Sequence, residues 1–392
     1  MALLAGVVKE TLPGERRVAL TPRVAEGLVK SGMSVLIERG AGVEAGYGDA
    51  DYESRGVGLG TREAVLEQAD VVAQVRTFGA NPDAGRADLA RFRRGQILIG
   101  LAEPLTALAE TTELAARGVT LFALELVPRI TRAQSMDVLS SMASVAGYKA
   151  VLLAADVLPK MFPMMMTAAG TVSPAKVLVL GAGVAGLQAI ATARRLGAVV
   201  SGYDIRPVAR EQVESLGARF VVLEEMDASA AGAEDKGGYA KAMGEEFYRR
   251  QRELLGAVIA QQDVVIATAA VPGKRAPVLI PAEAVAGMAG GSVIVDVAAE
   301  RGGNCALTRP GETIVINGVR ILGPLNLPAT VPFHASQMFA TNMAAFLKLI
   351  VTKGEAAIPW SDEIVRETAV IRDGKIVHPR VAELMGVTAE LA

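Results

Sequence analysis

The stretch KVLVLGAGVAGLQAIATARRLGAVVSGYD, residues 176–204, decides the fold of this chain. A short apolar run, Val177–Leu180, leads into the glycine turn G-A-G-V-A-G of residues 181–186. The helical pattern that follows ends at Gly197, and a second apolar strand ends at Asp204. An acid about 20 residues beyond a G-x-G-x-x-G turn belongs to the dinucleotide-binding fingerprint of a βαβ unit. The stretch therefore predicts a bound dinucleotide, with an ordinary glycine-rich turn between strand and helix as the alternative.

Each glycine of the turn has a physical role. Gly181 permits the tight turn, Gly183 lets the backbone approach a pyrophosphate, and Gly186 lets helix and strand pack closely. The helix start offers N–H groups and the positive end of its dipole to the phosphates. Asp204 can accept hydrogen bonds from ribose hydroxyls and repels a 2′-phosphate, which favours NAD(H) over NADP(H). Arg206 lies close to Asp204 in the sequence and softens that repulsion.

Length and composition limit the class of protein. With 392 residues the chain is too long for one compact core, and about two domains are expected. Its residues are 51% hydrophobic, 21% charged and 4% aromatic, which suits a globular α/β protein. The formal net charge is −2, so the chain lacks the basic footprint of a nucleic-acid-binding protein.

Cysteine content and the start of the chain bear on location. Cys305 is the single cysteine, which excludes an intrachain disulfide and indicates a reducing cytosol. Its simplest role is that of a small buried hydrophobe, with a nucleophile as the alternative. Charged residues enter too early in MALLAGVVKETLPGERR for a secretory signal. No window offers about 18 uncharged apolar residues without a glycine, so we expect no transmembrane helix and a soluble protein.

A whole domain precedes the fingerprint. Over residues 1–130, short apolar strands alternate with helical stretches, as in parallel α/β layers. A helical stretch over Ser135–Leu158 then connects the two domains. The strands expected in the first domain are Leu3–Val8, Ser34–Glu38, Val71–Gln74, Gln96–Gly100 and Thr120–Ala123.

Two segments of unusual composition flank the fingerprint. FPMMMTAAGT, residues 162–171, is bounded by prolines and predicts a loop or a hairpin arm. Consecutive methionines serve adaptable packing or an interface more often than redox chemistry. The polar stretch EEMDASAAGAEDKGGYAK, residues 224–241, predicts a mobile loop beside the nucleotide, with a solvated insertion as the alternative.

Further strands and hairpins follow the fingerprint. Asp263–Thr268 and Ser292–Val297 read as buried strands. Asn317-Gly318 and Asp373-Gly374 mark tight hairpin turns, and a long apolar helix over Gln337–Lys353 is expected to cross back to the first domain. The hairpin strands expected are Thr313–Ile316, Val319–Leu322, Ala369–Ile371 and Lys375–Val377.

Several motifs resemble those of a known family. KETLPGERRVALTP, residues 9–22, is similar to the opening of alanine dehydrogenases and of proton-translocating nicotinamide nucleotide transhydrogenases. PRITRAQSMDVLSS, residues 128–141, and FPMMMTAAGTVSPAKVLVLGAGVAGLQAIATARRLGA, residues 162–198, resemble the NAD(H)-binding component of the transhydrogenases. GGYAKAMGEEF, residues 237–247, and GGNC, residues 302–305, extend the resemblance over nearly the whole chain.

The resemblance implies an α/β fold of two Rossmann-like domains with parallel sheets, joined by long crossing helices, with NAD(H) in the interdomain cleft. The first domain, of the alanine dehydrogenase type, would comprise residues 1–136 plus 329–392, and the NAD(H)-binding Rossmann domain residues 137–328. A homodimer is also implied, with FPMMMTAAGT as part of its interface. The chain ends at Ala392 without membrane helices, which suits the bacterial form in which this component is a separate soluble subunit.

The resemblance assigns the nicotinamide end of NAD(H), and with it the catalytic role, to Arg129, Gln134 and Asp137. Arg129 would act as a charged hydrogen-bond donor, Gln134 would donate to and accept from the carboxamide, and Asp137 would orient its neighbours. Ser135 and Met136 complete the cofactor-binding part of this loop. The alternative is a polar loop before a helix whose first turn carries an acid, a place that the helix dipole favours.

The other cofactor-binding residues implied by the resemblance fall into four groups. Tyr239 would cover the cofactor as a lid, or stand as an exposed loop tyrosine. No metal site is expected. The four groups of cofactor-binding residues are as follows. Gly181, Gly183, Val184, Ala185 and Gly186 lie at the pyrophosphate, and Asp204, Ile205 and Arg206 lie around the adenosine ribose. Gly238 and Tyr239 belong to a closing loop, and Gln251 and Ala270 line the crevice.

A missing acid–base group separates the two activities of this family. Oxidation of an amino acid needs proton transfer, and alanine dehydrogenases place a lysine near residue 76 and a histidine near residue 100. Here Arg76 and Gly100 stand at these places, and the only histidines, His334 and His378, read as structural or surface residues. Hydride exchange between two nicotinamides moves no proton in the chemical step, so the absence favours transhydrogenation.

The sequence thus predicts the NAD(H)-binding subunit of a proton-translocating transhydrogenase. NADP(H) would bind a partner subunit, because only one complete fingerprint occurs here. Membrane-embedded partner subunits would carry the proton flux, and the chain would sit in the cytoplasm, peripheral on the inner face of the cell membrane. An amino-acid dehydrogenase of the alanine dehydrogenase type is the runner-up, and a non-catalytic NAD(H) sensor or scaffold is a third possibility.

Overall fold

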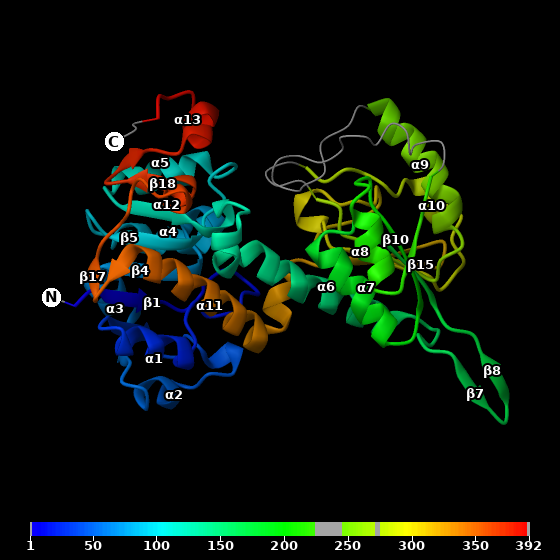
Figure 1. The fold of residues 1–392 in the computed structure, drawn as a ribbon, viewed down its shortest axis with the longest axis horizontal. Helices are drawn as coiled ribbons and strands as arrows, with labels where there is room; N and C mark the ends of the chain where they lie inside the picture. Colours follow the sequence, from blue (N-terminus) through cyan, green and yellow to red (C-terminus); the bar gives the residue numbers. More distant parts are fainter. Residues whose placement is uncertain (1, 224–244, 271–274, 390–392) are drawn as a thin grey trace. The chain divides into compact units, whose positions relative to one another are not determined.

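The computed structural model describes residues 2–223, 245–270 and 275–389 and divides the chain into two compact units. Unit 1 comprises Met1–Met142 and Ala329–Ala392, and unit 2 comprises Ala143–Pro328. Each unit is built around one large sheet with helices packed on it (Figure 1). The boundaries 136/137 and 328/329 expected from the sequence stay a prediction.

Unit 1 contains an eight-stranded sheet in the order β19-β18-β6-β5-β4-β1-β2-β3. The strands from β6 to β3 pair in parallel, whereas β18 pairs antiparallel with β6 and with β19. The strands are β1 (Leu4–Val7), β2 (Ser34–Glu38), β3 (Gly58–Gly60), β4 (Val71–Arg76), β5 (Ile97–Leu101), β6 (Thr120–Ala123), β18 (Ala369–Arg372) and β19 (Lys375–Ile376), with the small hairpin β16 (Val351–Thr352) and β17 (Glu355–Ala356) beside them in the chain.

The helices of unit 1 come from both of its chain segments. The segment before the fingerprint supplies α1 (Pro22–Lys30), α2 (Asp49–Glu53), α3 (Arg62–Gln68), α4 (Pro82–Leu89), α5 (Leu108–Ala116) and the 3₁₀ turns η1 (Val43–Ala45), η2 (Phe78–Ala80), η3 (Leu124–Leu126) and η4 (Thr131–Met136). The C-terminal segment supplies α11 (Pro332–Ile350), α12 (Glu363–Thr368) and α13 (Pro379–Met385). Helix α6 (Val138–Val157) begins in unit 1 and continues into unit 2.

Unit 2 contains a seven-stranded sheet in the order β11-β10-β9-β12-β13-β15-β14, parallel except for the β14–β15 hairpin. Its strands are β9 (Lys176–Leu180), β10 (Val199–Tyr203), β11 (Arg219–Phe220), β12 (Val264–Ala267), β13 (Val293–Asp296), β14 (Thr313–Ile316) and β15 (Val319–Leu322). Its helices are α7 (Val184–Arg195), α8 (Ala209–Ser215), α9 (Glu245–Ile259) and α10 (Ala282–Ala286), with the 3₁₀ turns η5 (Ala299–Arg301) and η6 (Leu327–Thr330) near its end.

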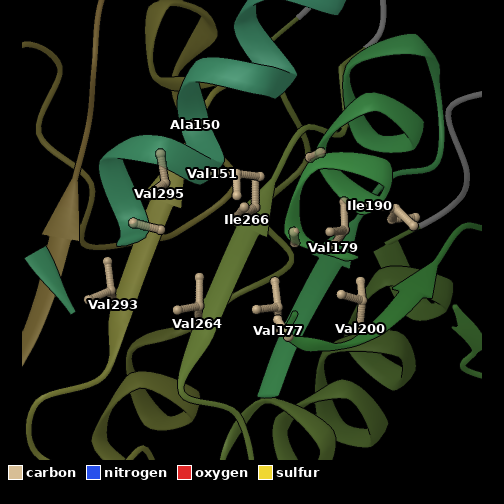
Figure 2. Close-up of a cluster of buried hydrophobic side chains, with 14 of the residues drawn as sticks. Ala150, Val151, Val177, Val179, Ile190, Val200, Val264, Ile266, Val293 and Val295 are labelled. Atoms are coloured by element: carbon tan, nitrogen blue, oxygen red, sulfur yellow. The ribbon is translucent and has the colours of Figure 1, made fainter. Parts of the chain in front are cut away.

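A valine-rich core lies on one face of the unit 2 sheet. Because parallel strands are covered on both faces, their sequences read as continuous apolar runs. On this face the side chains of three adjacent strands pack against helices α6 and α7 (Figure 2). They are Val177 and Val179 of β9, Val264 and Ile266 of β12, Val293 and Val295 of β13, and Ala150 and Val151 of α6.

Most expected elements are present, and one helix differs in its bounds. Ser34–Glu38 and Thr120–Ala123 form strands with the expected bounds, as do both strands of the Asn317-Gly318 hairpin. Both sheets are mainly parallel, as expected, and their antiparallel pairs are β14–β15 in unit 2 and β6–β18 and β18–β19 in unit 1. The helix expected over Gln337–Lys353 is α11, which starts at Pro332, since proline is well suited to a first helical position, and ends at Ile350.

Helix α6 is long and apolar enough to cross a membrane, by length and composition only. Ala146, Ala150 and Ala154 of this helix are nevertheless buried in the unit 2 core. Such burial is typical of a core helix in a water-soluble domain.

The methionine-rich segment forms a hairpin. Strands β7 (Met165–Thr167) and β8 (Gly170–Val172) pair only with each other, and every one of their residues is exposed. The hairpin extends away from the rest of unit 2 (Figure 1). The sequence leaves a loop and a hairpin arm open, and the structure shows the arm.

Candidate functional site

The glycine turn of unit 2 joins β9 to α7 in the expected strand–turn–helix arrangement. Gly181 has a φ of +90°, which glycine adopts without strain, and its N–H donates to Tyr203 O at 2.8 Å. A Cβ built at Gly186 would lie 1.8 Å from Gly181 O, so only glycine allows this approach of helix and strand. A Cβ at Gly183 would meet no atom within 4 Å, which leaves open space beside the N-cap of α7. Val184 and Ala185 form the first turn of the helix.

The turn lies at the point where the strand order in the sheet of unit 2 reverses. The chain runs outward from β9 through β10 to β11 and then returns to β12 on the other side of β9. Ligands of open α/β sheets bind beyond the carboxyl ends of the strands at such a point. Thr268, which directly follows β12, donates its hydroxyl to Gly181 O at 2.9 Å. We did not predict Thr268, although a hydroxyl residue at the end of an apolar strand is a readable signal.

Asp204 lies beside the glycine turn and is held by four N–H groups. Its carboxylate accepts from the backbone N–H of Ala182 at 2.7 Å and of Arg206 at 2.9 Å. The Arg206 guanidinium donates to both carboxylate oxygens, at 2.9 Å each. The side chains of Asp204 and Arg206 are only 6% and 13% exposed. A cofactor ribose would therefore have to replace Arg206 as a hydrogen-bond donor to this carboxylate.

The other predicted crevice residues have different environments. Gln251 of α9 is fully buried and donates to the Tyr203 hydroxyl at 2.8 Å, next to Asp204 in the chain. Burial raises the pKa of Tyr203 to about 12, so the hydroxyl stays protonated. Ile205 packs against the second core cluster of unit 2, and Ala270 is exposed beyond the end of β12. Gly238, Tyr239 and the polar stretch 224–241 around them lie outside the described residues.

The loop of residues 129–137 belongs to unit 1, where it forms the 3₁₀ turn η4. Arg129, Gln134 and Ser135 are exposed, whereas Met136 is buried. Two residues of the C-terminal segment hold the loop. Asn342 Nδ2 of α11 donates to Ser135 O at 2.8 Å, and Arg132 donates to both carboxylate oxygens of Asp362, at 2.7 and 3.0 Å.

Asp137 caps the N-terminus of α6. Its Oδ1 accepts the backbone N–H of Ser140 at 2.8 Å, and its Oδ2 accepts the Ser140 hydroxyl at 2.6 Å. A carboxylate in this position satisfies one of the unpaired N–H groups of the first turn. The helix-start alternative drawn from the sequence therefore describes the local role of Asp137.

Arg76 and Gly100 stand at the two positions where the resemblance implies acid–base groups in alanine dehydrogenases. Arg76 donates to Glu15 Oε2 at 3.4 Å. A Cβ built at Gly100 would lie 2.3 Å from Gln74 O, so position 100 has no room for a side chain. His334 is exposed on α11, and His378 is buried, accepts the N–H of Val381 and caps α13. Burial lowers the pKa of His378.

Two buried carboxyl groups of unit 1 were missed by sequence reasoning. Glu10 accepts the N–H groups of Val75 and Arg76, at the end of β4. Burial, with a smaller contribution from the negative Glu15, raises its pKa to about 8. Glu125 accepts the N–H groups of Ala102 and Glu103, just after β5. Burial raises its pKa to about 7.

A metal centre finds no support in the described part of the chain. No group of three or more His, Cys, Asp or Glu side chains that could hold an ion is present there. Cys305 is buried, and burial raises the pKa of its thiol, which suits a structural role.

Comparison with known families matches nearly the entire chain. Residues 6–146 match the alanine dehydrogenase/PNT N-terminal domain, and residues 150–379 match the alanine dehydrogenase/PNT C-terminal domain. The chain belongs to the alanine dehydrogenase/PNT family. The glycine turn and Asp204 lie within its C-terminal domain, and the loop of residues 129–137 lies within its N-terminal domain.

Relatives with two different names match this chain over nearly its whole length. A Rhodospirillum rubrum protein, named as the first part of NAD(P) transhydrogenase subunit alpha, is 47% identical over 376 residues, 95% of this chain and 97% of the relative. A crystal structure of transhydrogenase from Sinorhizobium meliloti matches with a TM-score of 0.85 and 42% identity, over 95% of this chain and 100% of that chain. Alanine dehydrogenase of Mycobacterium tuberculosis is 30% identical, over 97% of this chain and 96% of the relative. The chain is thus more similar to these transhydrogenases than to this alanine dehydrogenase.

Proposed function

We propose that this chain is the NAD(H)-binding subunit of a proton-translocating NAD(P) transhydrogenase. One observation carries the proposal beyond the names of its relatives. The dinucleotide turn is intact, yet Arg76 is tied to Glu15 and position 100 is closed to any side chain. A dehydrogenase acting on an amino acid needs a proton acceptor, whereas hydride exchange between two nicotinamides does not.

The residues of this chain would bind and orient NAD(H), which supplies the hydride when it is bound. The N–H groups at the start of α7, from Gly183 to Gly186, would hold the pyrophosphate, because a helix start attracts anions and Gly183 leaves space there. Asp204, beside Ile205 and Arg206, would hold the adenosine ribose. Positioning and a dry surface, rather than a catalytic base, are what such a reaction needs.

We assign the nicotinamide end to Arg129, Gln134 and Asp137, with Ser135 and Met136 between them. The exposed amide of Gln134 can both donate to and accept from a carboxamide. Gln251 would act through Tyr203 rather than by touching the cofactor, since it is fully buried. Ala270, Gly238 and Tyr239 complete the proposed set of contacts.

NADP(H) and the proton path are proposed to lie on partner subunits. Hydride would pass from NADH on this chain to NADP⁺ on a partner, and membrane-embedded subunits would couple the transfer to proton movement. The chain would then be cytoplasmic and held at the inner face of the cell membrane by these partners. We further propose a homodimer in which the hairpin β7–β8 contacts a second copy, because an isolated two-stranded hairpin is only marginally stable in water.

Hydride transfer to an NADP analogue tests the proposal. The purified chain with NADH alone should transfer little hydride, whereas adding a membrane fraction that contains the partner subunits should start the reaction. A chain that binds NADH but never supports transfer with these membranes would be a sensor or scaffold instead.

The similarity to alanine dehydrogenase calls for a direct assay of the alternative function, that of an amino-acid dehydrogenase. The chain is incubated with pyruvate, ammonia and NADH, and NADH consumption is followed by absorbance. Consumption at the background rate is expected, and brisk turnover would overturn the transhydrogenase proposal.

A further inference from the structure

Helix α6 crosses the start of α7 in direct backbone contact. Gly147 of α6 is buried, and a Cβ built on it would lie 2.0 Å from Ala185 O and 2.9 Å from Ala185 C. Real Cβ contacts do not come this close, and the atoms it would meet are backbone, which cannot rotate out of the way. Position 147 therefore accepts only glycine at the present distance between the two helices.

Ala185 stands in the first turn of α7, within the proposed pyrophosphate site. The contact with Gly147 thus lies directly behind the backbone that would hold the phosphates. Neighbouring alanines of α6 are buried over the unit 2 sheet, so the helix is anchored and does not simply yield (Figure 2). A methyl group at position 147 would have to displace the start of α7.

A second contact holds the turn through Thr268, which directly follows β12. Its hydroxyl contacts Gly181 O at 2.9 Å and Leu180 O at 3.3 Å. A Cβ built at Gly186 would also lie 3.1 Å from this hydroxyl. The glycine turn and the start of α7 are therefore in contact both with α6 and with the residue that follows β12.

We propose that Gly147 and Thr268 are positioning residues that hold the glycine turn in the geometry needed for a dinucleotide pyrophosphate. The inference rests on the proposed NAD(H) binding. A site that binds through backbone N–H groups works only if these groups are held within about 0.5 Å of the required geometry. Gly147 sets the distance of the turn from α6, and Thr268 sets its distance from β12. Adenosine, which lacks phosphates, would not use this turn.

Binding of NADH, ADP-ribose and adenosine to Gly147→Ala, Thr268→Val and the unchanged chain tests the inference by calorimetry. Both variants should bind NADH and ADP-ribose at least about tenfold more weakly, which is the scale of one lost good interaction, and adenosine as before. Gly256→Ala is the matched control, because a Cβ at this glycine of α9 would lie 4.0 Å from its nearest neighbour, Ala284 Cβ. The control should bind all three ligands normally.

Each outcome decides the inference. Unchanged NADH affinity in a folded Thr268→Val or Gly147→Ala protein would overturn it, as would an equal loss of adenosine, which marks general damage to the domain. Thr268→Val keeps the shape of the side chain, so it answers the question even where Gly147→Ala does not fold. If the unchanged chain binds adenosine and ADP-ribose but not NADH, the proposed function fails. The role of Gly147 and Thr268 in holding the glycine turn is then still measured with ADP-ribose.

Discussion

At the scale of single residues, Arg206 pairs with Asp204, and we propose that this pair sets the cofactor preference of the chain. The guanidinium satisfies both carboxylate oxygens and neutralises the charge that would repel a 2′-phosphate. Removing it should expose a full negative charge and free two acceptor positions for ribose hydroxyls. Arg206→Ala is therefore expected to keep NADH binding and to weaken NADPH binding by about tenfold.

Fluorescence titration of both cofactors measures this change in preference. Arg210→Ala is the control, since Arg210 is exposed and pairs with Glu214 one helical turn away. A variant that loses NADH binding as strongly as NADPH binding would show that Arg206 itself binds the cofactor.

Gln134 offers a second test at the residue scale. Its side chain is exposed on η4, so replacing it leaves the packing of the loop unchanged. Gln134→Ala should slow hydride transfer to the partner by about 100-fold, the cost of a misplaced reactant, and leave the Kd for NADH within about twofold. Thr131→Ala, an exposed position on the same turn, should change neither quantity. Unchanged transfer in Gln134→Ala would remove this loop from the nicotinamide site.

At the scale of elements, two buried acids hold the end of β4 and the residues that follow β5. Glu10 keeps its proton in the folded protein up to a pH of about 8, compared with an ordinary pKa of 4.5. Its folded pKa is raised, so its contribution to stability is complete below about pH 4.5 and is lost as the pH rises through 8. The free energy of unfolding should fall between about pH 5 and 8, by on the order of 1 kcal/mol per pH unit for one such group.

Glu10→Gln should flatten this dependence, because the amide does not ionise. Thermal unfolding at several pH values between about 5 and 8 measures the slope for both proteins. Glu44→Gln, at an exposed acid paired with Lys9, is expected to leave the slope unchanged. Equal slopes in Glu10→Gln and the unchanged chain would mean that Glu10 is ionised in the folded protein. The slope that remains in Glu10→Gln is assigned to Glu125, whose pKa of about 7 is also raised and changes the stability in the same direction.

The elements also show how far the sequence predicts this structure. Runs such as Ser34–Glu38 and the Asn317-Gly318 hairpin were located because apolar pattern and turn chemistry are local signals. The placement of β18 beside β6 was not predicted, since it depends on pairing between distant segments. Glu10 and Gly147 were missed for a related reason. From the sequence alone, a single acidic residue is expected to be exposed, and a glycine within a helix is expected to destabilise that helix. Their contacts become clear only once the neighbouring backbone is placed.

For the candidate site, the fingerprint placed the turn and Asp204 correctly as neighbours, and their contact through Ala182 follows from the βαβ geometry. The closed position at Gly100 could not be read from the sequence, because the atom that closes it belongs to the adjacent strand. The roles of Arg129 and Gln134 stay predictions. Thr268 directly follows an apolar strand, and a polar residue in that position is a signal for a site residue that the sequence does contain.

At the scale of the whole molecule, the strands of the hairpin β7–β8 pair only with each other, and all of their residues are exposed. Met164 and Met166 are 60% and 76% exposed, and Met165 and Val172 are 39% exposed each. Exposed apolar side chains gathered on one projecting element mark an interaction site. Flexible methionines also adapt well to an opposing surface. A second copy of the chain would bury them in the proposed homodimer.

Met166→Glu should convert this dimer into a monomer, because burying a carboxylate in an apolar interface costs several kcal/mol. Sedimentation velocity at micromolar concentration measures the change, and circular dichroism confirms that the variant is folded. Val315→Glu is the matched control, since Val315 is also an exposed apolar residue on a strand of unit 2, with 61% exposure. The control should sediment like the unchanged chain. Dissociation by Val315→Glu and not by Met166→Glu would move the interface to β14, and a monomeric unchanged chain would rule out the homodimer.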